Sequence, residues 1–172
     1  MRRLKLDLHT HCFELIRYSE ISINFIAKLV ASIKAKGLDG IAITEHHNSD
    51  YGYKVKEIVK HSFSSEVLII PGQEINVWPV QIVELYLDDT ITFRFLAHPG
   101  YPSDYYDGMA DLHGIELYNP LHDWHIDKQK VKEIAHKYQL LLLANSDAHN
   151  IDDIGSYYTE LFLEDLISRA KG

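Results

Sequence analysis

Residues 4–11 read LKLDLHTH, a stretch in which apolar and polar side chains alternate with a period of two. That alternation is typical of a β-strand, and it places Asp7, His9 and His11 on the same strand face. Charged side chains turned towards a core are costly unless they are paired or bound to a metal ion. Two imidazoles at adjacent positions of one face can chelate a single ion, so the stretch predicts a metal-binding strand rather than a solvated outer one.

Beyond this strand, short apolar segments alternate with amphipathic helical patterns. Helices are predicted over 22–36 and 127–138, capped by Ser22 and Asp127, and also over 50–61 and at the C-terminal end. Further strands are predicted at 40–44, 67–70, 81–87, 92–97, 115–118, 140–144 and 157–162. The strand at 67–70 is expected to stop at Pro71 and Gly72. The alternation predicts an α/β protein with a largely parallel sheet, either open and doubly wound or closed into a small barrel.

Length and composition set the broad class. The chain has 172 residues, 46% of them hydrophobic, which predicts a single globular domain over 1–172. One cysteine, Cys12, leaves no intrachain disulfide, so a reducing, cytoplasmic setting is expected. The start of the sequence lacks the pattern of a signal peptide. The apolar runs fall far short of the roughly 20 residues of a membrane span, so no membrane partner is expected.

The charge balance limits the partners. Lys and Arg total 17 against 25 Asp and Glu, a net charge of −8. Extensive binding to duplex nucleic acid is therefore not expected, because the phosphate backbone requires a basic face. A small phosphorylated substrate or a nucleotide remains compatible, since bound divalent ions would reverse the local charge.

The 11 histidines are the unusual feature of the composition, and many of them follow predicted strands. The polar residues at these strand ends are His9, His11, Glu45, His46, His47, Glu74, His98, Asn119, His122, Asn145, Asp147 and His149. The C-terminal strand edge is where α/β proteins build their sites. His46 and His47 are adjacent and would point opposite ways on an extended chain, so only one is expected to be a ligand, and we favour His46.

Several of these segments resemble the motifs of one known family, the PHP (polymerase and histidinol phosphatase) family. The segment 7–11, DLHTH, looks like its opening motif, and 43–46, ITEH, looks like the second, with Glu45 where Asp is usual. The segments 71–75, 97–100, 114–122 and 145–149 are similar to the later motifs, in the same order. The resemblance extends from residue 4 to about 163.

The resemblance implies a distorted seven-stranded (β/α) barrel of TIM-like, PHP type, with two or three divalent metal ions at its C-terminal mouth. It also implies hydrolysis of phosphate esters by a metal-activated hydroxide at a di- or trinuclear site. By position, one ion would be held by His9, His11, Glu74 and Asp147. The second would be held by Glu74, His98 and His122, with Glu74 as the bridge, and His46 and His149 would serve the third.

The chain departs from the family pattern in two places. Relatives carry a Ser-Asp-Gly segment soon after the first motif, whereas this chain has an insertion at 13–17, after which Glu20 could replace the Asp ligand. Many relatives also have a histidine where this chain offers Gln81. The sequence therefore does not decide whether the chain has a third metal site.

Roles for the remaining residues follow from their chemistry. Asp7 is expected to orient a ligand histidine from outside the metal's own ligands. His149 or Arg17 is expected to contact phosphate, and Tyr101 to line the substrate pocket. Imidazole-rich ligands without thiolates favour Zn, Mn or Fe over Mg.

Two other functions compete with the phosphoesterase. A metal-dependent amidohydrolase on a similar barrel commonly uses a bridging lysine at the end of a middle strand, and no lysine lies at such a place here. A noncatalytic PHP domain would be expected to have lost ligands, whereas the ligand candidates are all present.

Overall fold

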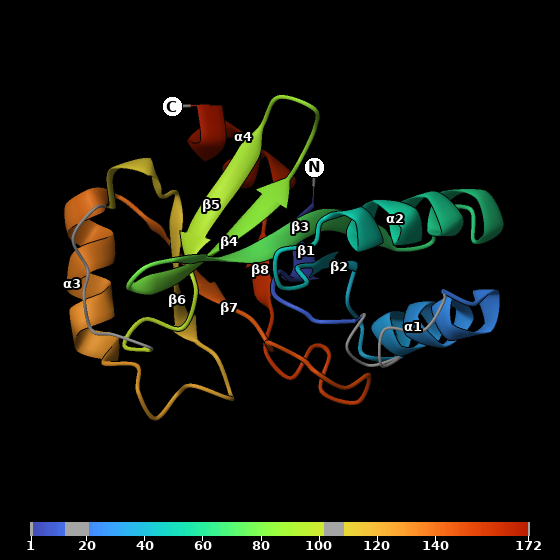
Figure 1. The fold of residues 1–172 in the computed structure, drawn as a ribbon, viewed down its shortest axis with the longest axis horizontal. Helices are drawn as coiled ribbons and strands as arrows, with labels where there is room; N and C mark the ends of the chain where they lie inside the picture. The colour runs from blue at the N-terminus through green and yellow to red at the C-terminus, as the bar shows by residue number, and fades with distance from the viewer. Residues whose placement is uncertain (1, 13–20, 102–108, 172) are drawn as a thin grey trace.

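A computed structural model describes residues 2–12, 21–101 and 109–171 of the chain. Its strands belong to one sheet with the order β7-β6-β5-β4-β3-β2-β1-β8 (Figure 1). The strands are β1 (Leu4–Asp7), β2 (Gly40–Ile43), β3 (Leu68–Val77), β4 (Val80–Tyr86), β5 (Thr92–Leu96), β6 (Gly114–Tyr118), β7 (Leu141–Ala144) and β8 (Thr159–Leu161). The helices are α1 (Ile23–Ala35), α2 (Asp50–Ser62), α3 (Lys128–Tyr138), α4 (Leu163–Lys171) and a 3-10 turn at Met109–Asp111.

The sheet curls until its two edge strands meet, which makes a nearly closed barrel. The seam between β7 and β8 is bridged by a side chain: Thr159 Oγ1 accepts from the N–H of Ala144 and donates to its carbonyl, both at 2.9 Å. The expected barrel is therefore confirmed, but with eight strands in place of seven. The extra strand, β8, is short and pairs with β1 in antiparallel orientation.

The expectation of a largely parallel sheet was wrong. Parallel pairing joins β1 to β2, β2 to β3, β5 to β6 and β6 to β7. Antiparallel pairing joins β3 to β4, β4 to β5 and β1 to β8. The segments between β3, β4 and β5 are too short to hold a crossover helix, so these strands follow one another as a meander.

The sequence predicted that the strand would stop at Pro71 and Gly72, but β3 runs through both residues. Pro71 is the last residue to pair with β2, opposite Ile43, and Gly72 is the first to pair with β4, opposite Leu85. A proline, which has no N–H to donate, is tolerated where a strand changes partners. Gly72 is required by close packing, since a Cβ there would lie 2.5 Å from the carbonyl oxygen of Glu84. The strand therefore continues through Glu74 to Val77.

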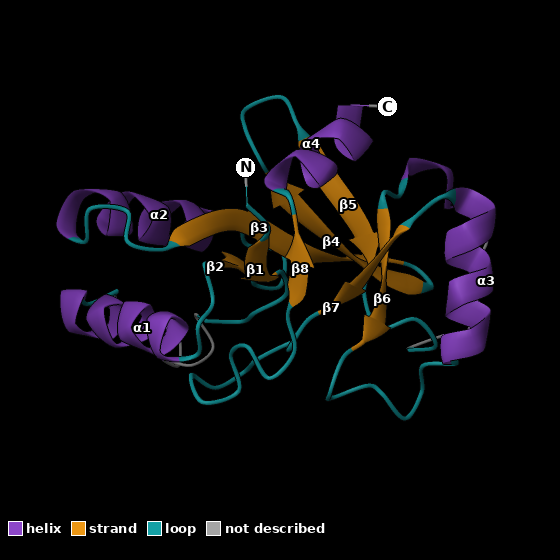
Figure 2. Cartoon of the chain, turned by 180° about the vertical axis from the view of Figure 1, so that it is seen from behind, coloured by secondary structure: helices purple, strands orange, loops and turns teal. Residues whose placement is uncertain are grey.

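The helices form where their caps and apolar stripes predicted them. Ser22 accepts a hydrogen bond from the N–H of Phe25, and Asp127 accepts from those of Gln129 and Lys130. Helices α1 and α2 lie side by side over one part of the barrel and α3 covers another (Figure 2). Strand β7, predicted to be fully buried, exposes Leu142 because it is an edge strand.

The hydrophobic core divides into three clusters, whose positions follow the arrangement of the helices around the barrel. One lies beneath α1 and α2, the second fills the barrel around Leu6, Phe93 and Phe95, and the third lies beneath α3. Cys12 is free and buried in the first cluster, as expected for a packing residue. Within the described ranges, none of the helices has the length and apolar character needed to cross a membrane.

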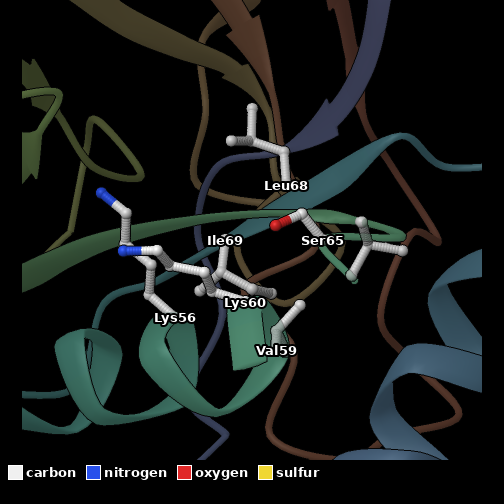
Figure 3. A pocket seen from close by; sticks show the side chains of 7 residues that line it. Lys56, Val59, Lys60, Ser65, Leu68 and Ile69 are labelled. Atoms are coloured by element: carbon white, nitrogen blue, oxygen red, sulfur yellow. The ribbon is translucent and has the colours of Figure 1, made fainter. Parts of the chain in front are cut away.

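A small cavity of about 220 Å³ lies between α2 and the amino end of β3 (Figure 3). Its floor is apolar, with Val59, Leu68 and Ile69, while the ammonium groups of Lys56 and Lys60 point away from that floor. It shares no residue with the histidine-lined cavity at the other end of the strands. The histidines and carboxylates of the predicted motifs line the second of these cavities.

Candidate metal centre

The polar residues of the predicted motifs converge at the carboxyl ends of the strands. His9 and His11 follow β1, His98 follows β5, and Asp147 follows β7. Glu74 differs from the prediction because it lies within β3, not beyond its end. His98 and Asp147 adopt positive φ angles of 27° and 53°, so both sit in sharp backbone turns.

Two carboxylate oxygens lie close to the Nε2 atoms of His9 and His11. Nε2 of His11 lies 3.2 Å from Nε2 of His9, 3.1 Å from Oδ1 of Asp147 and 3.5 Å from Oε2 of Glu74. Nε2 of His9 lies 3.5 Å from the same oxygens of Glu74 and Asp147. A tetrahedral ion with bonds of about 2.0–2.1 Å sets its ligand atoms about 3.3–3.4 Å apart. The distances from the two histidine nitrogens therefore fit ligands of one tetrahedral ion, and we call these four residues the tetrahedral set.

A second group lies beside the first. His98, His122 and Asp147 offer ligand atoms that all lie within 4.8 Å of one another. Nε2 of His98 is also 2.9 Å from Oε1 of Glu74, while the other oxygen of Glu74 faces His9 and His11. Glu74 and Asp147 thus stand between the two groups, as a bridging carboxylate would.

A third group is more exposed. His11, His46 and His149 also offer ligand atoms within 4.8 Å of one another. Nδ1 of His46 lies 3.1 Å from Oε2 of Glu74, whereas His47 points to Asn76 on the β3 strand. The geometry therefore places His46 with the cluster, and His47 outside it. Glu20 and Arg17, two predicted site residues, lie outside the described residues.

The cluster contains buried polar atoms that form no hydrogen bond within the described structure. These atoms are Nδ1 of His11, Nδ1 of His122 and Oδ1 of Asp147. Buried polar groups are normally satisfied, and each unsatisfied one requires an explanation such as an ion. Because Oδ1 of Asp147 belongs to the tetrahedral set, its lack of a partner fits a site built for a cation.

The pKa shifts of the cluster residues also indicate a site for a cation. Burial alone would lower the pKa of His9, but the carboxylates of Asp147, Glu116 and Glu74 raise it well above the usual value. Burial would raise the pKa of Glu74, and its histidine neighbours instead hold it well below the usual value. The site therefore concentrates ionised carboxylates in a buried space, an arrangement that is stabilised by a cation.

One carboxylate of the cluster was missed at the sequence level. Glu116 lies in β6, is fully buried, and accepts a hydrogen bond from Nδ1 of His9 at 3.0 Å. The available signal was a charged residue between the apolar Ile115 and Leu117, in a strand whose neighbours are buried. An acidic residue at such a position requires specific partners.

The role expected of Asp7 needs correction. Its carboxylate accepts from the backbone N–H groups of Ser146 and Gly155, at 3.0 and 2.8 Å, and from the Ser146 hydroxyl. The ring of His9 has Glu116 as its partner instead. Asp7 therefore fixes the loop that carries Asp147 and His149, and the histidine ring is oriented from another strand.

The cluster opens into a cavity of about 250 Å³. Besides the histidines and carboxylates, this cavity is lined by Tyr101 and by Gln81. The ring of Tyr101 lies 5.8 Å from that of His98 and 4.9 Å from that of His122, measured between centroids. Tyr101, His46 and His149 are the more exposed residues of this lining, whereas Glu74 and Asp147 are buried.

Comparison with known proteins bears on both fold and family. A family model described as PHP-associated matches residues 125–171. No curated protein matches the chain in sequence. Solved structures share the fold, among them two that match nearly the whole chain. The first, PsfC from Pseudomonas syringae, has a TM-score of 0.68 and 18% identity, over 98% of this chain and 89% of that one.

The second structure comes from Bifidobacterium adolescentis and is described, provisionally, as a metal-dependent phosphoesterase. It has a TM-score of 0.67 and 12% identity, over 96% of both chains. Identities this low show the fold alone. Together with the PHP-associated segment at 125–171, that fold confirms the resemblance to the PHP family that the motifs predicted.

Proposed function

We propose that the chain is a metal-dependent hydrolase of phosphate esters, acting on a phosphomonoester or a phosphodiester. The observation that carries this proposal is that Nε2 of His9 and of His11 lie 3.1–3.5 Å from each other and from the carboxylate oxygens of Glu74 and Asp147. The likeness of the fold to a structure described as a metal-dependent phosphoesterase supports it.

The donor set fits divalent ions of the first transition row. Imidazole nitrogens and carboxylate oxygens without thiolates suit Zn, Mn or Fe better than Mg, which prefers oxygen ligands and retains its water. In the proposal, the tetrahedral set holds one ion, and Glu74, His98 and His122 hold a second beside it. His46 and His149, with Glu20, would hold a third.

Bound divalent ions supply Lewis-acid polarisation of the phosphoryl group and lower the pKa of water towards neutrality. The chain's own residues supply the rest. The buried carboxylates of Glu74 and Asp147 fix the ligand histidines in place, and Asp7 anchors the loop behind them. His149 and Tyr101, which line the cavity, would contact a phosphate ester, and Arg17 is a further candidate for that contact.

The partner implied is a small phosphorylated molecule or a nucleotide. A net charge of −8 would repel such an anion, so local positive charge from the ions is a condition of binding. The lone, unpaired cysteine is compatible with a cytoplasmic setting.

The test combines metal content with turnover. Protein purified without chelator is expected to contain about two or more equivalents of a divalent metal. With Mn²⁺ added, it is expected to hydrolyse a generic phosphomonoester or phosphodiester. A panel of amides serves as the comparison, and turnover of amides alone would establish the amidohydrolase instead. A folded protein that takes up no metal would refute the proposal.

A further inference from the structure

Glu116 is saturated with hydrogen-bond donors although it is completely buried. Its Oε1 accepts from Nδ1 of His9 at 3.0 Å and from Nδ2 of Asn145 at 2.8 Å. Its Oε2 accepts from the backbone N–H of His98 at 2.7 Å and from Nδ2 of Asn119 at 3.1 Å. A carboxylate offers about four lone-pair positions, and all four are used here. The group is thus fixed in one orientation as an acceptor.

This arrangement determines which nitrogen of His9 is free. An ionised carboxylate can only accept, so Nδ1 of His9 must carry the proton. Nε2 is therefore the nitrogen of His9 that is left to bind a metal ion beside His11, Glu74 and Asp147. Fixing the tautomer and ring angle of a ligand histidine is a known use of an outer carboxylate.

The same carboxylate acts on the neighbouring group of ligands. Its bond to the N–H of His98 supports a residue held at φ 27°, and that turn brings Nε2 of His98 within 2.9 Å of Glu74. Asn119 donates to Glu116 and also to Oδ2 of Asp147, at 3.2 Å. Ligand candidates of both groups therefore depend on one side chain.

We propose that Glu116 is a positioning residue that couples the two metal sites while contacting neither ion. The inference rests on the proposed metal centre but goes beyond it, because it links the two sites through a residue that is itself no metal ligand, in addition to Glu74 and Asp147, which stand between them. Without Glu116, His9 can rotate or change tautomer and His98 loses the support of its turn. Both sites should weaken together.

The experiment compares stepwise Zn²⁺ binding by calorimetry in the wild-type chain and in Glu116→Gln. The substituted amide keeps the shape but sets an NH₂ group against donors. We expect both binding steps of the variant to weaken by about 10–100-fold. His122→Ala serves as the contrast, since it removes a ligand from one group and should weaken one step only.

Glu84→Gln is the matched control for burying an amide. Glu84 is also a nearly buried carboxylate in a strand, but its partners are Gln73, Tyr86 and Arg94, away from the histidines. It should bind Zn²⁺ like the wild type. Unchanged binding in Glu116→Gln, or weakening of one step alone, would overturn the coupling. Failure of the wild type to bind Zn²⁺ would instead refute the metal centre.

A spectroscopic signature separates positioning from a general loss of structure. In the Zn²⁺-loaded wild type, ¹⁵N-histidine spectra should show a slowly exchanging, downfield Nδ1–H proton for His9. Glu116→Gln should shift that proton upfield or broaden it, with the amide spectrum of the barrel otherwise retained. A His9 Nδ1–H signal that is unaltered by the substitution would contradict the proposal.

Discussion

The carboxylate of Asp7, at the end of β1, accepts a hydrogen bond from the backbone N–H of Ser146, 3.0 Å away. It accepts a second from the N–H of Gly155 at 2.8 Å. One side chain thus ties the first strand to the loop after β7, which carries Asp147 and His149. Burial raises the pKa of Asp7 to about 6, despite these donors.

The first prediction concerns stability against pH in the presence of chelator. The pKa of Asp7 rises from 3.8 in the unfolded chain to about 6 in the folded one, so the folded state binds the extra proton. Protonation of Asp7 therefore adds about 3 kcal/mol to the free energy of unfolding below pH 4, and this contribution is lost as the pH rises through 6. Relative to Asp7→Asn, the wild type should therefore lose free energy of unfolding between pH 4 and 7. Denaturant titrations that give parallel profiles would contradict this.

The second prediction concerns Glu74, which lies within reach of His9, His46 and His98. Glu74→Gln removes a charge shared by the candidate sites. Removing a residue that only hydrogen-bonds to a metal ligand typically lowers metal affinity or activity ~10–100-fold. Because Glu74 is itself a candidate ligand, metal affinity and turnover should both fall by more than that. Equilibrium dialysis and initial rates measure the two effects. Glu84→Gln, with its carboxylate bound to Arg94, should leave both unchanged, and equal losses in the two variants would point to misfolding.

The third prediction is stabilisation by metal. Oδ1 of Asp147 is buried without a hydrogen bond among the described residues, and an ion bound to it would offset the cost of its desolvation. Metal at one hundred times its dissociation constant stabilises the folded state by about 2.7 kcal/mol. For a chain of this size that is roughly 5–10 °C in Tm. Thermal unfolding with Zn²⁺ or Mn²⁺ against chelator measures it, and coincident curves would rule out a metal that binds the folded state.

The fourth prediction is proton release on metal binding. Surrounding carboxylates raise the pKa of His9 well above 6.5, so its Nε2 is protonated near neutrality in the metal-free protein. A metal must displace that proton, so metal affinity should fall about tenfold for each pH unit between 7 and 6. Calorimetry in buffers of different ionisation enthalpy should give about one proton released at pH 7. Binding without proton release would place the proton elsewhere in the cluster.

Many of the strands and helices could be predicted from patterns of neighbouring residues in the sequence. The alternation at 4–11 predicted the first strand and put His9 and His11 on one face. Ser22 and Asp127 marked the starts of two helices, since capping depends on residues only three or four positions apart. The approximate gathering of ligand candidates at strand ends followed from the parallel pairs, whose carboxyl ends share one edge.

What the sequence could not determine depends on contacts between distant residues. Pro71 and Gly72 are turn formers by local preference, yet β3 runs through them because β2 and β4 pair with it on opposite sides. The partner of the His9 ring is Glu116, 107 residues away, and no local period reveals that pairing. Periodicity and capping act over a few residues, so the sequence by itself determined the strands, the helices and the candidate ligands. Only the closing of the barrel decided which carboxylate holds which histidine, because those bonds join strands that lie far apart in the sequence.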